Sequence, residues 1–134
     1  MTESKVSFEL AKDEFYNWLE TKKGISKEKI DRKPDLKEAV ETIAYAISDG
    51  VISIDADGFI IQKLKSSDVK ETELKFKPKI KARDLDKMKS YKDDNGKSRA
   101  MISALTDVFT GVIDNLDTND IALSQTIALF YYLP

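Results

Sequence analysis

Apolar residues recur at spacings of three and four in two segments near the N-terminus, which is typical of helices that bury one face. The first segment covers residues 7–21 and stops before Gly24. The second starts near Pro34, which a first helical turn tolerates, and ends at residues 49–50. A polar connector separates the two predicted helices. Their apolar stripes are Phe8, Ala11, Phe15, Trp18 and Leu19, and Leu36, Val40, Ile43, Ala44 and Ile47.

The hydrophobic period then changes from that of a helix to the period of two that strands show. Two short β-rich runs, residues 51–55 and 59–64, flank a turn that contains Asp57 and Gly58, which predicts a β-hairpin. Across residues 73–80 apolar and mostly charged residues alternate, which predicts a third strand with one apolar face. We expect these strands to form a small antiparallel sheet.

Helical spacing returns after this strand. Leu85 and Met88 predict a short helix, and the polar stretch that follows predicts a loop with Asn95 and Gly96 as turn residues. A longer helix follows, and Gly111 is expected to end it. Its apolar face consists of Met101, Ile102, Leu105, Val108 and Phe109.

A final helix is predicted close to the end of the chain. Asp117 or Thr118 can cap it, and Asp120 stands in its first turn, where the helix dipole favours an acidic side chain. This helix carries the apolar residues Ile121, Leu123, Ile127 and Phe130.

These elements predict an α+β fold, mostly helical, with a small antiparallel sheet made of hairpin 51–64 and strand 73–80. A length of 134 residues fits a single domain, residues 1–134. A polar stretch would divide it into sub-lobes 1–66 and 70–134, each with a very small core.

The composition excludes most familiar active sites. The chain has no cysteine and no histidine. It therefore lacks disulfides, thiolate chemistry, ordinary zinc sites and histidine acid–base catalysis. Its five glycines stand apart from one another, so there is no glycine-rich phosphate loop. We expect a protein that is not an enzyme, with no catalytic residues and no cofactor.

Charge and hydropathy bound the compartment and the partners. The first ten residues are polar where a signal peptide needs an apolar core, and no apolar run approaches the length of a membrane span. We therefore expect a cytoplasmic protein without a membrane partner. The 22 basic and 24 acidic residues give a formal net charge of -2, so an electrostatic partner would have to meet a local patch.

Clustered carboxylates raise the alternative of a calcium site. Asp55 and Asp57 lie just before a predicted strand and lack the later bidentate glutamate of a calcium-binding loop, so a hairpin turn explains them better. Near the C-terminus, Asp114, Asp117 and Asp120 raise the same question, and a helix cap and a first-turn acid explain the last two. We expect no metal site.

The most ordered charged pattern is a basic segment that overlaps the third predicted strand. Its local positive charge is sufficient to attract phosphates, so a nucleic-acid surface is one hypothesis. However, the alternate positions are apolar residues that must face a core, and lysines together with Pro78 also protect an edge strand from aggregation. Nucleic acid is therefore the less favoured partner. The basic segment consists of Lys75, Lys77, Lys79, Lys81 and Arg83.

The C-terminal part of the chain has the opposite charge. No basic residue follows Arg99, whereas Asp107, Asp114, Asp117 and Asp120 are acidic. Such polarity suits head-to-tail self-association or the docking of a charged helical partner. Equally, the basic and acidic regions can attract each other within one fold.

A succession of short motifs covers residues 72–132. A strand leads through a basic residue and Asp-Leu, residues 83–85, into a helix rich in alanine and leucine, residues 100–109. A Val-Ile-Asp-x-Leu link follows at residues 112–116, and Asp-x-x-Asp-Ile at residues 117–121 introduces the final helix. This succession resembles the small tail assembly chaperones of long-tailed bacteriophages.

The resemblance implies a cytoplasmic, non-catalytic protein of the bacterial host cell. Such a chaperone coats the long helical tape-measure protein, keeps it soluble and helps to recruit tail-tube subunits. The resemblance also implies self-association and, in many members of the family, a longer frameshifted product. The helices predicted within residues 7–50 are more than this pattern leads us to expect ahead of the strand.

For such a function, apolar faces of the C-terminal helices rimmed with charge are the expected surface for a helical client or for self-association. The alternatives are a nucleic-acid-binding phage regulator that uses the basic segment, and a virion structural subunit. The expected partner-binding residues are the exposed parts of Met101, Leu105, Phe109, Ile127, Phe130 and Tyr131.

Overall fold

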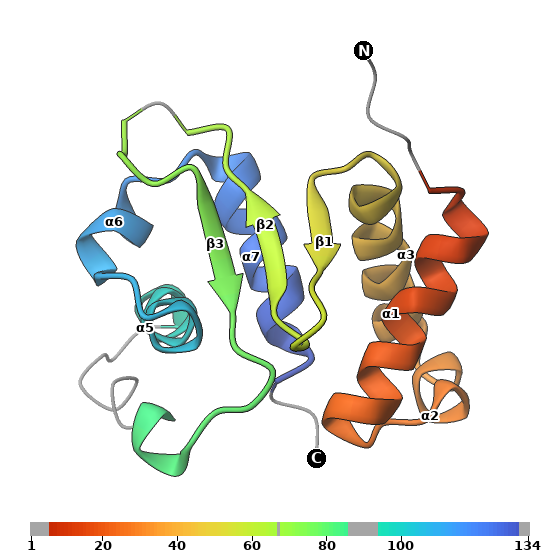
Figure 1. Ribbon diagram of the computed structural model, residues 1–134. Coiled ribbons are helices and arrows are strands. Elements are labelled where there is room, and N and C mark those ends of the chain that lie inside the picture. Colours follow the sequence, from red (N-terminus) through yellow and green to blue (C-terminus); the bar gives the residue numbers. More distant parts are fainter. Residues whose placement is uncertain (1–5, 67, 86–93, 132–134) are drawn as a thin grey trace.

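The computed structural model describes residues 6–66, 68–85 and 94–131. Within these ranges the chain is mostly helical and has a small three-stranded antiparallel sheet (Figure 1). The predicted α+β class is therefore confirmed. In spatial order the strands are β1 (Ile52–Ile54), β2 (Ile60–Lys63) and β3 (Glu73–Phe76).

The two predicted N-terminal helices are present and pack against each other beside β1 (Figure 1). Helix α1 spans Phe8–Lys23 and α3 spans Pro34–Ser48. The hydroxyl of Ser7 caps α1 by accepting the N–H of Leu10 at 3.2 Å. Gly24 ends α1 with a φ of 66°, a left-handed conformation that glycine adopts without a steric penalty.

The connector between α1 and α3 is not simply polar, because it contains the short helix α2 (Lys27–Asp31). The side chain of Ile30 is fully buried in the core, which anchors this helix. The hydroxyl of Tyr16 donates to the carboxylate of Asp31 at 3.0 Å and ties α2 to α1. One isolated isoleucine in a charged stretch gives no periodicity, so the sequence did not predict this turn of helix.

The sheet has one buried face and one outer face. Rows of paired residues cross the sheet from β1 to β3, and helix α7 (Thr118–Leu129) lies behind it in Figure 1. The outer row has exposed serine and lysine at its two ends and a half-buried isoleucine between them. The rows on the buried face are Ile52, Gln62 and Leu74, and the half-buried Ile54 with Ile60 and Phe76; the outer row is Ser53, Ile61 and Lys75.

The hairpin turn between β1 and β2 is held by local and tertiary hydrogen bonds. The carboxylate of Asp55 accepts the N–H groups of Asp57 at 2.9 Å and Phe59 at 3.0 Å. Gly58 has a φ of 89°, and its carbonyl accepts the indole N–H of Trp18 at 2.7 Å. The turn is therefore confirmed, and Asp55 folds the hairpin by bonding its own backbone.

The third strand was predicted to extend to residue 80, but it ends at Phe76. The N–H of Lys77 donates to the carbonyl of Leu105 at 2.9 Å instead of joining a strand ladder. Pro78, one residue later, has no N–H to donate. The alternating pattern thus continues beyond the point where the backbone leaves the sheet.

The loop predicted around Asn95 and Gly96 is wrong. Both residues lie in the first turn of α5 (Asp94–Thr106), where the backbone of Gly96 is buried. A glycine at the start of a helix costs little and leaves room for close packing. The predicted short helix is a 3-10 turn, η1 (Ala82–Leu85), and Met88 lies outside the described residues.

The longer helix does not continue to Gly111 as predicted. Helix α5 ends at Thr106 because Asp107 adopts a φ of 58°, which an α-helix cannot contain. The chain then forms the separate short helix α6 (Thr110–Asp114), in which Gly111 is an interior residue. Gly111 was therefore misread as a helix end.

A buried polar network attaches α7 to the sheet and to the chain after β2. The amide of Gln62 donates to the carbonyl of Asp120 at 2.9 Å and accepts the hydroxyl of Ser124 at 2.5 Å. The carboxylate of Asp120 accepts the N–H groups of Lys65 at 2.9 Å and Ser66 at 2.8 Å. Asp120 is therefore an attachment between distant segments as well as a first-turn acid.

Both predicted sub-lobes contribute to one buried apolar cluster. The ring of Phe15 stacks on Trp18 at a centroid distance of 5.7 Å and meets Phe130 edge-on at 5.1 Å. This aromatic contact joins α1 to the end of α7. Tyr131 directly follows Phe130 in the chain.

Candidate functional site

The residues expected to bind a partner lie in different environments. Phe109 is 86% exposed, and Tyr131 is partly buried. The four others were expected to have exposed parts, but each is 1% exposed or less. These side chains pack between the helices and the sheet. Helical spacing predicts an apolar face but does not tell whether the core or a partner covers it. The buried residues are Met101, Leu105, Ile127 and Phe130.

Phe109 lies at the end of the turn that joins α5 to α6, which we call the exposed turn, residues 107–109. Single exposed apolar residues are common on protein surfaces and need no function. Phe109 differs because its turn is held in a defined shape. Asp107 has a left-handed φ of 58°, an uncommon conformation for a residue other than glycine.

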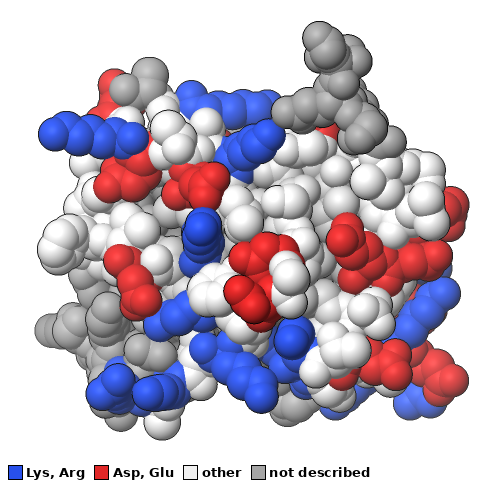
Figure 2. Space-filling view, in the orientation of Figure 1, with Lys and Arg blue, Asp and Glu red and all other residues white. Residues whose placement is uncertain are grey.

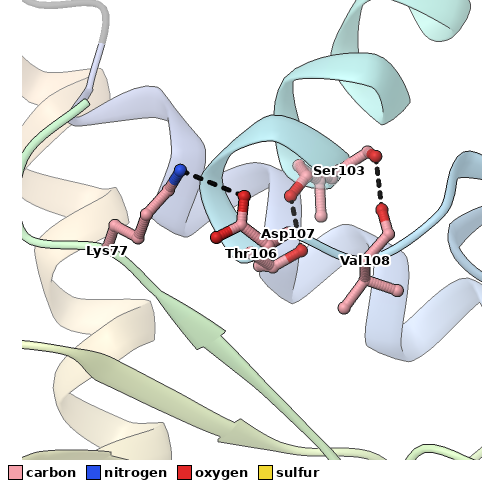
Figure 3. A network of polar contacts seen from close by, with 6 residues as sticks. Lys77, Ser103, Thr106, Asp107 and Val108 are labelled. Carbon is pink, nitrogen blue, oxygen red and sulfur yellow. Dashed lines mark hydrogen bonds and ion pairs between the residues drawn. The ribbon is translucent and has the colours of Figure 1, made fainter. Parts of the chain in front are cut away.

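Lys77 holds the exposed turn from the side of the sheet (Figure 3). Its ammonium lies 3.2 Å from the carboxylate of Asp107, and its N–H donates to the carbonyl of Leu105. Its own carbonyl accepts the hydroxyl of Tyr131 at 2.5 Å. The residue that follows β3 thus connects the sheet, the end of α5 and the C-terminal segment.

The end of α5 holds the same turn from its other side. The hydroxyl of Ser103 donates to the carbonyl of Val108, and these two residues lie beyond Asp107 as seen from Lys77 (Figure 3). The hydroxyl of Thr106 donates to the carbonyl of Ile102 at 2.8 Å, one turn earlier. The backbone is thus fixed immediately before Phe109, so that Phe109 is presented by an ordered support.

The left-handed backbone of Asp107 gives a stability prediction. Asp107→Val should lower the free energy of unfolding by about 1–2 kcal/mol, because a β-branched residue is disfavoured at positive φ. Asp107→Asn keeps the side-chain shape and tolerates this conformation, and it loses an exposed ion pair worth at most about 1 kcal/mol. Urea unfolding followed by circular dichroism measures both changes. Equal losses would assign the effect to the ion pair and not to the backbone.

The basic segment runs from β3 into η1 and is largely exposed. Lys75 lies on the outer face of the sheet, and Lys79, Lys81 and Arg83 are exposed beyond it. Figure 2 shows basic side chains gathered over the lower front of the molecule, around the end of β3 and η1. Lys77 is half-buried, and its ammonium pairs with Asp107.

The acidic residues of the C-terminal part mostly meet partners within the fold. Asp107 pairs with Lys77, and Asp114 accepts from the guanidinium of Arg99 at 2.6 Å. Asp120 is buried and bonded to the chain after β2, whereas Asp117 is exposed. The sequence left open whether the basic and acidic regions meet a partner or each other. The ion pair between Lys77 and Asp107 is a case of attraction within the fold.

A half-buried lysine lies next to this region, and no sequence pattern predicted it. The ammonium of Lys23 lies 3.9 Å from the ring centroid of Tyr131 and 5.8 Å from that of Trp18. Burial, and then the charge of Lys79, lower the pKa of Lys23 to about 8. Burial raises the pKa of Tyr131. Lys23 and Tyr131 are distant in sequence, so only the tertiary structure brings them together.

Lys23 gives a pH prediction with a defined sign. Its pKa is lower in the folded state, so the unfolded chain holds more protons between about pH 8 and pH 10.5. The destabilising effect of the buried charge is complete below about pH 8, and the free energy of unfolding should rise with pH through this window. Lys23→Met should flatten that rise, as measured by urea unfolding at several pH values.

The pH measurement should stop below about pH 10, where tyrosine ionisation acts in the opposite direction. Burial and the hydrogen bond to Asp31 raise the pKa of Tyr16 to about 12, so the folded state retains a proton that the unfolded chain loses. Stability should fall with pH in that higher range. An unchanged pH profile in Lys23→Met would show that another group carries the dependence.

Among the described residues, no group of three or more acidic side chains is placed to hold a metal ion. No helix in the described ranges combines the length and the apolar composition needed to cross a membrane. No protein-family model, no curated protein and no solved structure matches the chain.

Proposed function

We propose that this chain is a non-enzymatic tail assembly chaperone of a long-tailed bacteriophage or prophage. It acts in the cytoplasm of the bacterial host, binds the helical tape-measure protein while the tail is assembled, and associates with other copies of itself. It also helps to recruit tail-tube subunits. The succession of motifs in residues 72–132 supports the family, and the exposed turn supports a binding function.

The observation that carries the proposal is the exposure of Phe109 on an ordered support. A large aromatic side chain that is 86% exposed leaves apolar surface in water, where a partner can cover it. Lys77 and Ser103 fix the backbone before it, so little further ordering of that backbone is needed when a partner binds. Aromatic anchors of this kind often dominate the binding energy of protein interfaces.

An amphipathic helix is the type of client that this arrangement suits. Such a helix presents an apolar stripe with polar flanks, and it can lay the stripe on an aromatic anchor while the flanks meet the charged rim. A tape-measure protein is a long series of such helical segments that aggregates unless its stripes are covered. Coverage by many chaperone copies would keep it soluble.

Co-expression with the tape-measure protein of the same phage tests the function. We expect the tape-measure protein to become soluble and to co-purify with the chain. A client that stays insoluble, with nothing co-purified, would reject the chaperone function. Finding the chain in purified virus particles would instead identify a virion structural subunit, because a chaperone leaves the finished tail.

A further inference from the structure

The exposed turn and the basic segment meet at Lys77. The ammonium of Lys77 lies 3.2 Å from the carboxylate of Asp107. The Cα atom of Phe109 is at most about 7 Å from that of Asp107, because two residues of chain span no more. Lys75 and Lys79 are each two residues from Lys77 and lie within the same reach of it. Through Lys77 the basic segment therefore reaches the turn that carries Phe109.

The basic segment extends from β3 to η1. Residues 74–83 contain five basic residues and no acidic residue. Lys79 lies close enough to Lys23, at the end of α1, for its charge to act on that ammonium. Basic side chains accordingly gather over the lower front of the molecule (Figure 2). The local charge of this stretch is positive although the whole chain has a net charge of -2.

Acidic groups also lie close to Phe109 in the chain. The side chain of Asp107 is 70% exposed and that of Asp114, in α6, is 53% exposed. A nucleic-acid strand lying across Phe109 would bring phosphates toward these carboxylates. A peptide helix avoids this repulsion because it carries different side chains on its different faces.

We infer that the partner segment bound at this surface is an amphipathic helix with one acidic flank. Its apolar stripe covers Phe109, and its carboxylates lie over Lys75, Lys79 and Arg83. This inference rests on the proposed function and narrows its client to helical segments of that charge. Attraction between the acidic side of the helix and the basic segment orients docking and speeds association, which lowers the Kd when dissociation is unchanged.

Two synthetic helical peptides test the charge preference on the wild-type chain. Both carry the same leucine stripe, and one has glutamates on a flank where the other has lysines. Fluorescence anisotropy at about 50 mM salt should show the acidic peptide binding about tenfold more tightly or better. The difference should shrink at about 500 mM salt, where surface charges are screened.

Charge-reversal variants test the location of the binding surface. A triple variant, Lys75→Glu with Lys79→Glu and Arg83→Glu, should bind the acidic peptide about tenfold more weakly. The matched control reverses three exposed lysines in other parts of the chain, Lys33, Lys37 and Lys70. It has the same net charge and should stay within about twofold of the wild type. Unfolding curves confirm that both variants are folded.

Three outcomes of the peptide-binding measurements would overturn the inference. These are equal affinity for the two peptides, equal losses in the triple variant and its control, or tighter binding of a single-stranded or duplex DNA oligonucleotide than of the acidic peptide. Tape-measure capture separates the two proposals. If the triple variant captures that protein as well as the wild type does, the inference fails and the chaperone function stands. If the acidic peptide binds but no tape-measure protein is captured, the function fails and the preference for acidic helices stands.

Discussion

Replacing Asp120 with alanine should lower the free energy of unfolding by about 2–4 kcal/mol. The carboxylate is 4% exposed and accepts the N–H groups of Lys65 and Ser66 as well as the hydroxyl of Ser66 at 2.5 Å. Hydrogen bonds to a charged acceptor are stronger than neutral ones, and their loss leaves partly buried donors without a partner. Helix α7 would lose these three bonds to the chain after β2 and keep the bond from the N–H of Asp117 to the hydroxyl of Ser66.

Asp117→Ala is the matched control, because Asp117 is the N-cap residue of the same helix. Its side chain is exposed and makes no capping hydrogen bond, so only its interaction with the helix dipole is lost, at most about 1 kcal/mol. Urea unfolding followed by circular dichroism compares the two variants. If both lose the same small amount, the Asp120 network contributes little to stability.

The contrast between these two aspartates shows what the sequence can and cannot predict. Both were assigned from their position at the start of a helix, and that position is correct. Whether a first-turn acid also reaches another segment depends on the path of the chain after β2, more than fifty residues away. Local propensity carries no information about such a contact.

Regular periodicity predicted the elements in which it is strong and failed where it is short or misleading. Helices α1 and α3, the hairpin and the final helix follow from clear periods of 3.6 or two. The short helix α2 depends on one buried isoleucine, Ile30. Asn95 and Gly96 have the composition of a turn, but tertiary packing of α5 places them in its first turn.

The candidate site was predicted only in part. Phe109 was selected as one of several residues on a helical face, but that face ends with α5 at Thr106. Beyond this point the helical spacing no longer describes where a side chain lies, so the buried Leu105 and the exposed Phe109 appeared equivalent in sequence. The backbone of Asp107 separates them, and an aspartate is a weak signal for a left-handed residue.

The lysines of the basic segment were interpreted as protecting an edge strand from aggregation, and the structure limits that interpretation. Only Lys75 belongs to β3, while Lys79, Lys81 and Arg83 follow it on the way to η1 and through it. Protection of a strand edge therefore explains at most the first part of the segment. The remaining charge is exposed after the strand, where it can meet a partner.

Replacing Phe109 with alanine should weaken capture of the tape-measure protein by about 30-fold or more, because truncating an aromatic hot spot typically costs at least about 2 kcal/mol of binding free energy. The free energy of unfolding should change by less than about 0.5 kcal/mol, since the side chain is 86% exposed and supports no core contact of comparable size. Titration of a soluble tape-measure fragment by isothermal calorimetry gives the first quantity, and urea unfolding gives the second.

Leu10→Ala provides the matched control, because Leu10 is a large apolar residue that is 62% exposed on α1. It removes a similar kind of apolar surface, but not one presented by the exposed turn, so tape-measure binding should stay within about twofold of the wild type. Equal binding losses in the two variants would mean that the client responds to exposed apolar surface in general. A loss confined to Phe109→Ala would locate the client on the exposed turn. Both substitutions leave the core intact, so unfolding would not explain such a difference.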